Sequence, residues 1–362
     1  MAELNPPTNP YIQMLAGMSP GRHPLYCPGP PTPRFCKRYR ETQKINTPPV
    51  YIGEDDFHVP KLLGFDAISL WMFRSPQKPP ISLGHETLID AWGRKKHGKW
   101  YLNEGVLTSE QAWDEWIATG FFTYPPDQEF ISLSSLLRQL TQGPLAGMAF
   151  DASLAGAFEK MWQGMGFLRF ARALRRNERN FIGLALDHLL AFSMGIAQRW
   201  VKFTGIKNFI ITDDMAYKGR PLISPQDWAT LLLPRYTNFT NKIHDMGGHV
   251  ILHSDGQVEP LIPLFIQAGF DAIQGLEPAA GVDIFHVMKQ YKNKIMLIGN
   301  LDVSYLLVYS QPSDVRRETE KILDHARKMN TRIAISTSQQ IDESCKPENI
   351  IAMCQMTRNS NI

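Results

Sequence analysis

Acidic, histidine and amide residues follow four short apolar runs in the second half of this sequence, and a segment with helical periodicity comes after each run. Carboxylates and imidazoles can transfer protons, hold a divalent cation or orient a substrate. When such residues recur at the carboxyl ends of parallel strands, they are typical of the mouth of a βα barrel. We therefore expect one cavity to collect Asp213, Asp214, His253, Asp255, Glu277 and Asp302.

His253 and Asp255 stand two positions apart just after an apolar run, so their side chains face the same side if the chain stays extended. An imidazole and a carboxylate placed in this way can ligate one metal ion, such as Zn²⁺ or another divalent cation. The alternative is a hydrogen-bonded loop in which Asp255 caps a helix that begins near Gln257. The sequence predicts these two residues as candidate metal ligands.

The other acidic residues also have two interpretations. Asp213 and Asp214 could bind a cation, orient a substrate nitrogen or transfer a proton, or they could pair with basic residues a few positions later. Glu277 and Asp302 could supply a general acid or a further ligand, with stabilisation of a loop as the ordinary alternative. We expect catalytic roles for these four residues and substrate contacts from Lys218, Asn300 and Gln339.

Periodicity along the chain predicts an α/β fold in which strands and helices alternate. Strands are indicated at 50–52, 67–71, 148–150, 208–211, 250–252, 272–273 and 295–298, with a hairpin from 99–102 and 105–107. Helices are indicated at 154–165, 168–178, 181–203, 225–246, 257–268, 283–291, 312–328 and 347–357. Right-handed crossovers would close these units into a barrel, with the hairpin as an excursion before it.

The first 49 residues hold eleven of the 26 prolines, which remove backbone donors and disfavour helix at the preceding residue. We expect an irregular N-terminal arm at 1–49, followed by a single barrel domain at 50–362. The arm could pack loosely, cover the barrel mouth or contact a neighbouring subunit.

Composition narrows the functional class. Hydrophobic residues make up 43% of the chain and charged residues 20%, which is typical of a globular enzyme with a large core. The formal net charge of +3 is too small to indicate a nucleic-acid-binding protein. The four cysteines form no C-x-x-C pair, and the sequence has neither a leader-like start nor an uninterrupted apolar stretch of membrane-spanning length. We expect a cytoplasmic protein.

Several blocks of the sequence resemble one family. They are Lys218-Gly219-Arg220-Pro221 after Asp213-Asp214, His253-Ser254-Asp255-Gly256, Leu276-Glu277-Pro278, Gly299-Asn300-Leu301-Asp302 and Pro347-Glu348-Asn349-Ile350. In order and spacing over about residues 140–357, they are similar to the uroporphyrinogen decarboxylase superfamily, which also contains corrinoid-dependent methyltransferases. The resemblance implies a (βα)₈ TIM barrel.

Two departures from the family patterns bear on the activity. The decarboxylases hold their substrate's carboxylates with an arginine-rich block of the type R-Q-A-G-R-Y, to which Gly21-Arg22-His23 is a poor match. The methyltransferases that activate thiols bind zinc through His-x-Cys and a later Cys, whereas this chain has His253-Ser254-Asp255 and then Ser338 or Gln339. Histidine and carboxylates are harder metal ligands than thiolates, so a metal ion that they hold is better suited to an oxygen ligand. The alternative is that the metal has been lost.

The resemblance therefore implies a methyltransferase that moves a methyl group between a small ether, alcohol or similar substrate and the corrinoid of a separate carrier protein. The alternatives are decarboxylation of a tetrapyrrole or another carboxylated substrate, and a barrel without catalytic activity. Similarity to the decarboxylases further implies a homodimer.

Overall fold

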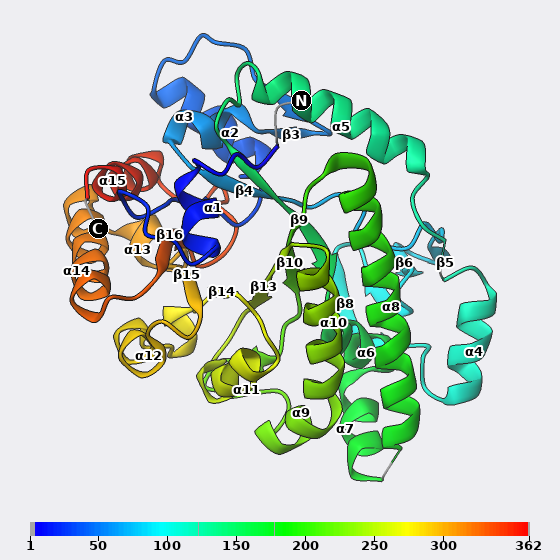
Figure 1. Cartoon of the computed structure of the whole chain (residues 1–362). Coiled ribbons are helices and arrows are strands. Elements are labelled where there is room, and N and C mark those ends of the chain that lie inside the picture. The colour runs from blue at the N-terminus through cyan, green and yellow to red at the C-terminus, as the bar shows by residue number, and fades with distance from the viewer. Residues whose placement is uncertain (1–3, 122, 177, 361–362) are drawn as a thin grey trace.

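The computed structural model describes residues 4–121, 123–176 and 178–360. Its 8-stranded sheet is parallel throughout, and a parallel bridge between Leu25 and Ile335 joins the first strand to the last. Figure 1 shows the helices arranged around this barrel, so the predicted (βα)₈ TIM barrel is confirmed. The strands, in their order around it, are β1 (Tyr26–Cys27), β4 (Ala67–Leu70), β9 (Ala149–Ala155), β10 (Asn208–Thr212), β13 (His249–Ser254), β14 (Ala272–Gly275), β15 (Met296–Leu301) and β16 (Ile333–Thr337).

The helices of the outer layer follow the predicted periodicity closely. Two predicted helices are divided near a proline, which lacks an N–H and clashes with the preceding turn. The first becomes α9 (Pro225–Leu231) and α10 (Leu233–Asp245), and the second becomes η1 (Glu259–Leu261) and α11 (Ile262–Gln267). The other predicted helices are α6 (Ala157–Met165), α7 (Phe167–Arg175), α8 (Arg179–Thr204), α12 (Ile284–Tyr291), α14 (Pro312–Met329) and α15 (Pro347–Arg358). Two short helices, η2 (Pro278–Ala280) and α13 (Leu306–Tyr309), were not predicted.

Residues 4–49 are more ordered than the irregular arm that the prolines suggested. They form α1 (Pro10–Leu15), the barrel strand β1 and α2 (Pro33–Thr42). Pro10 and Pro33 each occupy the first turn of a helix, where a missing N–H costs no hydrogen bond, and Asn9 and Thr32 cap those helices. The expected boundary after residue 49 therefore lies beyond the first barrel strand, and the proline-rich segment is part of the barrel.

Helix α1 closes the amino-terminal end of the barrel. Tyr11, Met14 and Leu15 pack in one buried cluster with inward-facing residues from the first positions of several strands, including Ala67 and Ala272. Next to this helix, the Asn9 side chain donates to the carbonyl oxygens of Asp66 and Gly147 at 2.8 Å. The open, carboxyl end of the barrel is thus the end that is available for a site.

An excursion between β4 and β9 lies against the outside of the mouth. Its main part is a four-stranded antiparallel sheet, in which β8 pairs with β7 and not with the segment 105–107 that the sequence suggested. Tyr101 of β8 donates to the carbonyl oxygen of Gln163 in α6 at 2.8 Å, which fixes the sheet on that helix. The elements of this region are β5 (Ile81–Gly84), β6 (Thr87–Ile89), β7 (Arg94–His97), β8 (Trp100–Gly105), α4 (Glu110–Ala118) and α5 (Asp127–Thr141). Before β4 the chain forms β2 (Tyr51–Ile52), β3 (Asp55–Asp56) and α3 (His58–Leu63).

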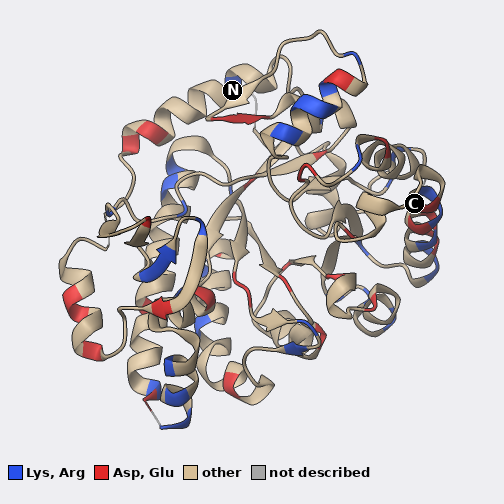
Figure 2. Cartoon of the chain, turned by 180° about the vertical axis from the view of Figure 1, so that it is seen from behind, with Lys and Arg blue, Asp and Glu red and all other residues tan. Residues whose placement is uncertain are grey.

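Helix α8 is long and apolar enough to cross a membrane by length and composition alone. However, 67% of its apolar window is buried inside the molecule, which is typical of a core helix. Figure 2 shows acidic and basic residues interspersed along the ribbon, most clearly along α14, in agreement with the small net charge.

We predict that truncating the plug of the barrel destabilises the fold. Replacing Met14, which is 2% exposed, by alanine leaves a cavity at the closed end and should lower the free energy of unfolding by about 2–5 kcal/mol. Met18→Ala is the control, because Met18 is 49% exposed and its loss should change stability by less than about 0.5 kcal/mol. Urea unfolding followed by circular dichroism measures both. Equal stability of the two variants would show that α1 does not seal the barrel.

Candidate active site

Alternation along β10 and β13 decides which polar side chains reach the barrel interior. Ile210 and Ile251 belong to the interior cluster, so residues at even spacing from them also face inward. Asp214 follows Ile210 at this spacing, and His253 and Asp255 follow Ile251. Asp213 has the opposite orientation, as do the outward-packing residues at 209 and 211.

Asp214, His253 and Asp255 form one cluster at the mouth. The Nε2 atom of His253 lies 3.7 Å from an Asp255 carboxylate oxygen and 3.9 Å from one of Asp214. The potential ligand atoms of the three residues all lie within 4.8 Å of one another. The backbone N–H of Asp255 also donates to Asp214 at 3.0 Å, so the two aspartates are tied together. The predicted pairing of His253 with Asp255 is present, and Asp214 is its third member.

The orientation of His253 is set by Gln274 of β14. The Gln274 amide nitrogen donates to the backbone carbonyls of Thr337 and Ser338, at 3.4 and 3.3 Å, so its oxygen faces Nδ1 of His253 and accepts a hydrogen bond from it. This places the other ring nitrogen, Nε2, toward the two aspartates. An imidazole held by an outer hydrogen bond in this way is typical of metal-ligating histidines.

The electrostatics of the cluster favour a cation. Burial, together with the charges of Glu159 and Asp255, raises the pKa of Asp214 to about 7. Burial opposes protonation of His253, but the two aspartates and Gln274 outweigh it and raise the pKa of His253. One oxygen of Asp255 is buried without a hydrogen-bond partner among the described residues. An imidazole nitrogen and two carboxylate oxygens within 4.8 Å of one another fit a divalent ion.

Asp213 holds the neighbouring helix instead of lining a pocket. It is fully buried, and its two carboxylate oxygens accept from the N–H groups of Phe158 and Glu159, at 3.2 and 2.6 Å, and from the Tyr236 hydroxyl. Burial raises its pKa to about 6. Gly156 is required beneath it, because a Cβ there would lie 2.1 Å from the Asp213 Cβ. The aspartate expected to transfer protons thus caps the first turn of α6.

Glu159, a residue that the motifs did not indicate, lies beside the cluster on α6. Its carboxylate pairs with Lys160 at 2.6 Å and accepts from Gln163 at 2.8 Å. Burial opposes its charge, but Lys160 and Arg94 outweigh burial and lower the pKa of Glu159. The only signal in the sequence was an acidic residue in the first turn of a predicted helix, which is too common to identify a site.

Two pockets open on the cluster, and Asp255 lines both. We call the larger one, of about 600 Å³, the aromatic pocket; its walls include Lys218, Asp214, Glu277, Tyr101, Trp162, Phe167 and Tyr217. Glu277 accepts from the N–H of Gly256 at 3.1 Å, which fixes it on that wall. We call the smaller one, of about 180 Å³, the inner pocket; it is lined by Trp71, Thr212, His253, Gln274 and Gln339, among others.

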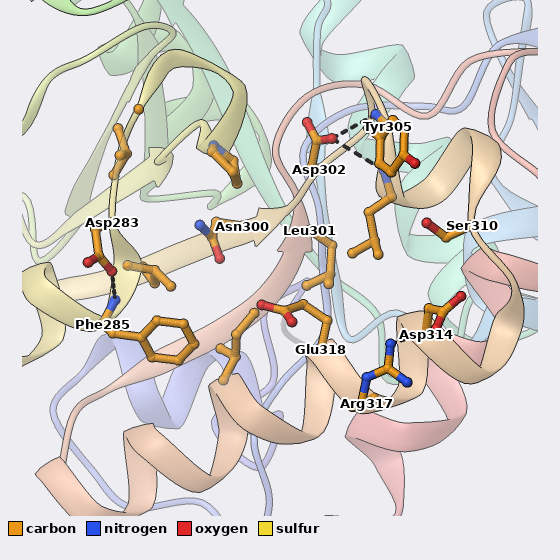
Figure 3. Close-up of a pocket in the computed structure, with 16 residues that line it drawn as sticks. Asp283, Phe285, Asn300, Leu301, Asp302, Tyr305, Ser310, Asp314, Arg317 and Glu318 are labelled. Carbon is orange, nitrogen blue, oxygen red and sulfur yellow. Dashed lines mark hydrogen bonds and ion pairs between the residues drawn. The ribbon is translucent and has the colours of Figure 1, made fainter.

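Asn300 and Asp302 do not join these pockets. They line a separate groove of about 610 Å³ that lies toward α12 and α14, as Figure 3 shows. The Asn300 amide donates to the carbonyl of Leu276 at 3.1 Å, and Asp302 accepts from the N–H groups of Ser304 and Tyr305. The expectation that all the acidic residues share one cavity is therefore wrong for Asp302 as well as for Asp213, and Asp302 has the loop-stabilising geometry.

Comparison with known proteins agrees with the motifs. The family model for uroporphyrinogen decarboxylase (URO-D) matches residues 161–360. The chain belongs to this family. Among solved structures, a methyltransferase from Methanosarcina mazei superposes with a TM-score of 0.68 at 15% identity, covering 99% of each chain, which shows a shared fold. A family 2 AP endonuclease from Brucella melitensis, at 8% identity, covers 90% of this chain and 96% of its own with a TM-score of only 0.43. No curated protein sequence matches the chain.

We predict that Asp214 makes stability depend on pH. Its pKa in the folded state, about 7, exceeds the unfolded value near 3.8, so the folded form binds more protons between these values. The free energy of unfolding should therefore fall as pH rises from about 4 to 7. In chelator-treated protein, Asp214→Asn should reduce the loss of stability between pH 4 and pH 7 and should be more stable than the wild type at pH 8. Asp114→Asn is the control, because Asp114 is exposed, and it should change neither quantity. Urea titrations at three pH values test this, and an unchanged slope would count against it.

Proposed function

We propose that this URO-D family member is an enzyme that transfers a methyl group between a small oxygen-bearing substrate and the corrinoid of a separate carrier protein. The observation that carries the proposal is the Asp214–His253–Asp255 cluster, which stands at the barrel mouth where the family's methyltransferases have thiolate ligands. Imidazole and carboxylates in place of thiolates favour an oxygen ligand over a thiol.

In the proposed reaction, the residues of the site have different roles that follow from their positions. Asp214, His253 and Asp255 would hold a divalent ion, which when bound supplies Lewis acidity toward the donor oxygen. Glu277 lines the aromatic pocket beside the cluster, and in the proposed reaction it would give a proton to the leaving oxygen. In the proposed transfer, the electron pair of the carrier's cobalt(I) would form the new bond to the methyl carbon. The oxygen would keep the electron pair of the broken carbon–oxygen bond and take the proton. The corrinoid performs the difficult chemistry, while this chain positions the donor.

Decarboxylation is the second candidate, because the family model is that of a decarboxylase. A tetrapyrrole with many carboxylates needs several free arginines. Arg22, the nearest match to the family's arginine block, is instead paired in a fork with Asp66, at 2.8 and 2.5 Å, just before β4 begins. This end of the strand is the one that α1 closes. The arrangement therefore supports methyl transfer ahead of decarboxylation.

The proposed activity is tested by incubating the enzyme with a reduced corrinoid protein, or with free cob(I)alamin, and a panel of methyl ethers and alcohols. We expect loss of the cobalt(I) absorbance and formation of methylcobalt. His253→Ala should lower the rate by more than roughly 100-fold, since losing even an outer partner of a ligand costs 10–100-fold. His286→Ala is the control, because that histidine is 58% exposed and pairs with Glu259 away from the cluster's ligand atoms. No cobalt methylation by the wild-type enzyme with any donor would move the assignment to decarboxylation.

The metal is tested separately on purified protein. We expect about one equivalent of a divalent ion, zinc being the first candidate, that a chelator removes with a fall in melting temperature, since an ion that binds only the folded state stabilises it. His253→Ala and Asp255→Asn should abolish binding, whereas His286→Ala should retain it. Full activity in metal-free protein would contradict a role for the ion and leave proton donation as the means of activating the donor.

A further inference from the structure

Arg74 is a partly buried arginine that has no ion-pair partner among the residues that the structure describes. It lies four residues beyond the end of β4, on the connection to β5, and therefore at the mouth end of the barrel. Its guanidinium carbon stands 5.2 Å from the centre of the Trp71 ring. Among the residues that the structure describes, none forms a hydrogen bond or an ion pair with it. Arg40 and Arg94, whose side chains are only 15% and 19% exposed, pair with Asp56 and Asp90 at 2.7 Å.

The partial burial of the Arg74 guanidinium favours the binding of an anion beside it. Burial lowers the pKa of Arg74, and the nearby charge of Glu159 only partly offsets this. A guanidinium cannot lose its proton near neutral pH, so a partly desolvated one gains from any anion that reaches it. Stacking on an aromatic ring uses the face of the guanidinium and leaves its N–H edges free. Those edges match the two oxygens of a carboxylate.

Trp71 connects this arginine to the active site. Trp71 and His253 both line the inner pocket. The indole is held in place, because its N–H donates to the carbonyl of Pro28 at 3.1 Å and a Cβ at Gly29 would lie 2.1 Å from its ring. The platform under Arg74 is thus fixed by the segment that follows β1. A fixed platform reduces the entropy lost when the arginine binds a ligand.

The inner pocket is small and polar. Its volume of about 180 Å³ corresponds to about six water-sized volumes, at about 30 Å³ each. Thr212, Gln274 and Gln339 contribute hydrogen-bonding groups to its wall. A compact polar molecule fits this space, whereas a large ring system does not.

We propose that the inner pocket, together with Arg74 beside it, binds a small methoxy-substituted carboxylic acid. The ether oxygen lies in the pocket facing His253 and Asp255, and the carboxylate extends past Trp71 to pair with Arg74, which does not itself line the pocket. The choice of a methyl donor rests on the proposed function, whereas the carboxylate-binding role of Arg74 does not. With methoxyacetate as the donor, transfer of the methyl group to cobalt(I) and protonation of the oxygen leaves glycolate.

Binding is tested by calorimetry on the metal-loaded protein without a corrinoid. The probes are methoxyacetate and 2-methoxyethanol, which has a hydroxyl in place of the carboxylate. We expect the wild-type protein to prefer methoxyacetate, and Arg74→Gln to weaken that binding roughly 10- to 100-fold, the range for loss of a charge-assisted pair. Binding of 2-methoxyethanol should not change. Arg74→Lys keeps the positive charge but not the paired N–H groups of the guanidinium. Its affinity for methoxyacetate should therefore lie between those of the wild type and Arg74→Gln.

Arg34→Gln is the matched control, because Arg34 is 82% exposed, pairs with Glu343 at 3.3 Å and is not among the residues that line the inner pocket. It should bind methoxyacetate as the wild type does. The proposal is overturned if the wild-type protein shows no preference for the carboxylate, or if Arg74→Gln binds methoxyacetate as tightly as the wild type. Melting curves of each variant establish that it is folded before binding is measured.

Failure of the proposal and failure of the proposed function give different results. Arg74-dependent binding without cobalt methylation by any donor would reject methyl transfer but retain the carboxylate site. Cobalt methylation from neutral ethers at a rate that Arg74→Gln does not alter would retain methyl transfer and reject the carboxylate site.

Discussion

The active site depends on one backbone hydrogen bond at the point where β10 and β13 end. The N–H of Asp213 donates to the carbonyl of His253 at 2.9 Å, and the register pairs Thr212 with His253. This bond fixes the end of β10 relative to the end of β13. As a result, the inward-facing side chain of Asp214 after β10 lies next to His253 of β13. Two adjacent aspartates then take opposite roles: Asp213 caps α6 from outside the barrel, and Asp214 joins the cluster inside it. The helix that Asp213 caps brings Glu159 to the same place.

Much of the fold could be predicted from the sequence, because periodicities of two and 3.6 residues survive in long elements. Strand β1 could not, since a two-residue strand has no periodicity and the prolines around it resemble those of a loop. Its pairing with β4 and its bridge to β16 come from closure of the barrel, which is a non-local constraint. The same segment positions Trp71, so the prolines belong to the architecture of the site as much as to the barrel.

The site was predictable only in part, for a related reason. Alternation along one strand was enough to place His253 and Asp255 on the same side. It was not enough to decide which of Asp213 and Asp214 faces the barrel interior. That decision required knowing that Ile210 faces inward, which only the structure shows. Asp302 follows a strand end as the others do, but its carboxylate is occupied by the turn after it. Arg74 carried no motif, and its significance comes from the absence of a partner among the described residues, which a sequence cannot report.

The distribution of charge around the mouth adds a further constraint on any substrate. Asp214, Asp255 and Glu277 face the aromatic pocket with Lys218 as the basic residue of its lining, whereas Arg74 stacks on the tryptophan of the inner pocket. A cation held by the cluster would neutralise two of these carboxylates and leave Glu277 and Lys218 in balance. An anionic group is then repelled least and attracted most on the side of Arg74, so a substrate with one carboxylate has a single favourable orientation. For the proposed substrate, that orientation would leave the aromatic pocket as the open side, from which its methyl group would be transferred.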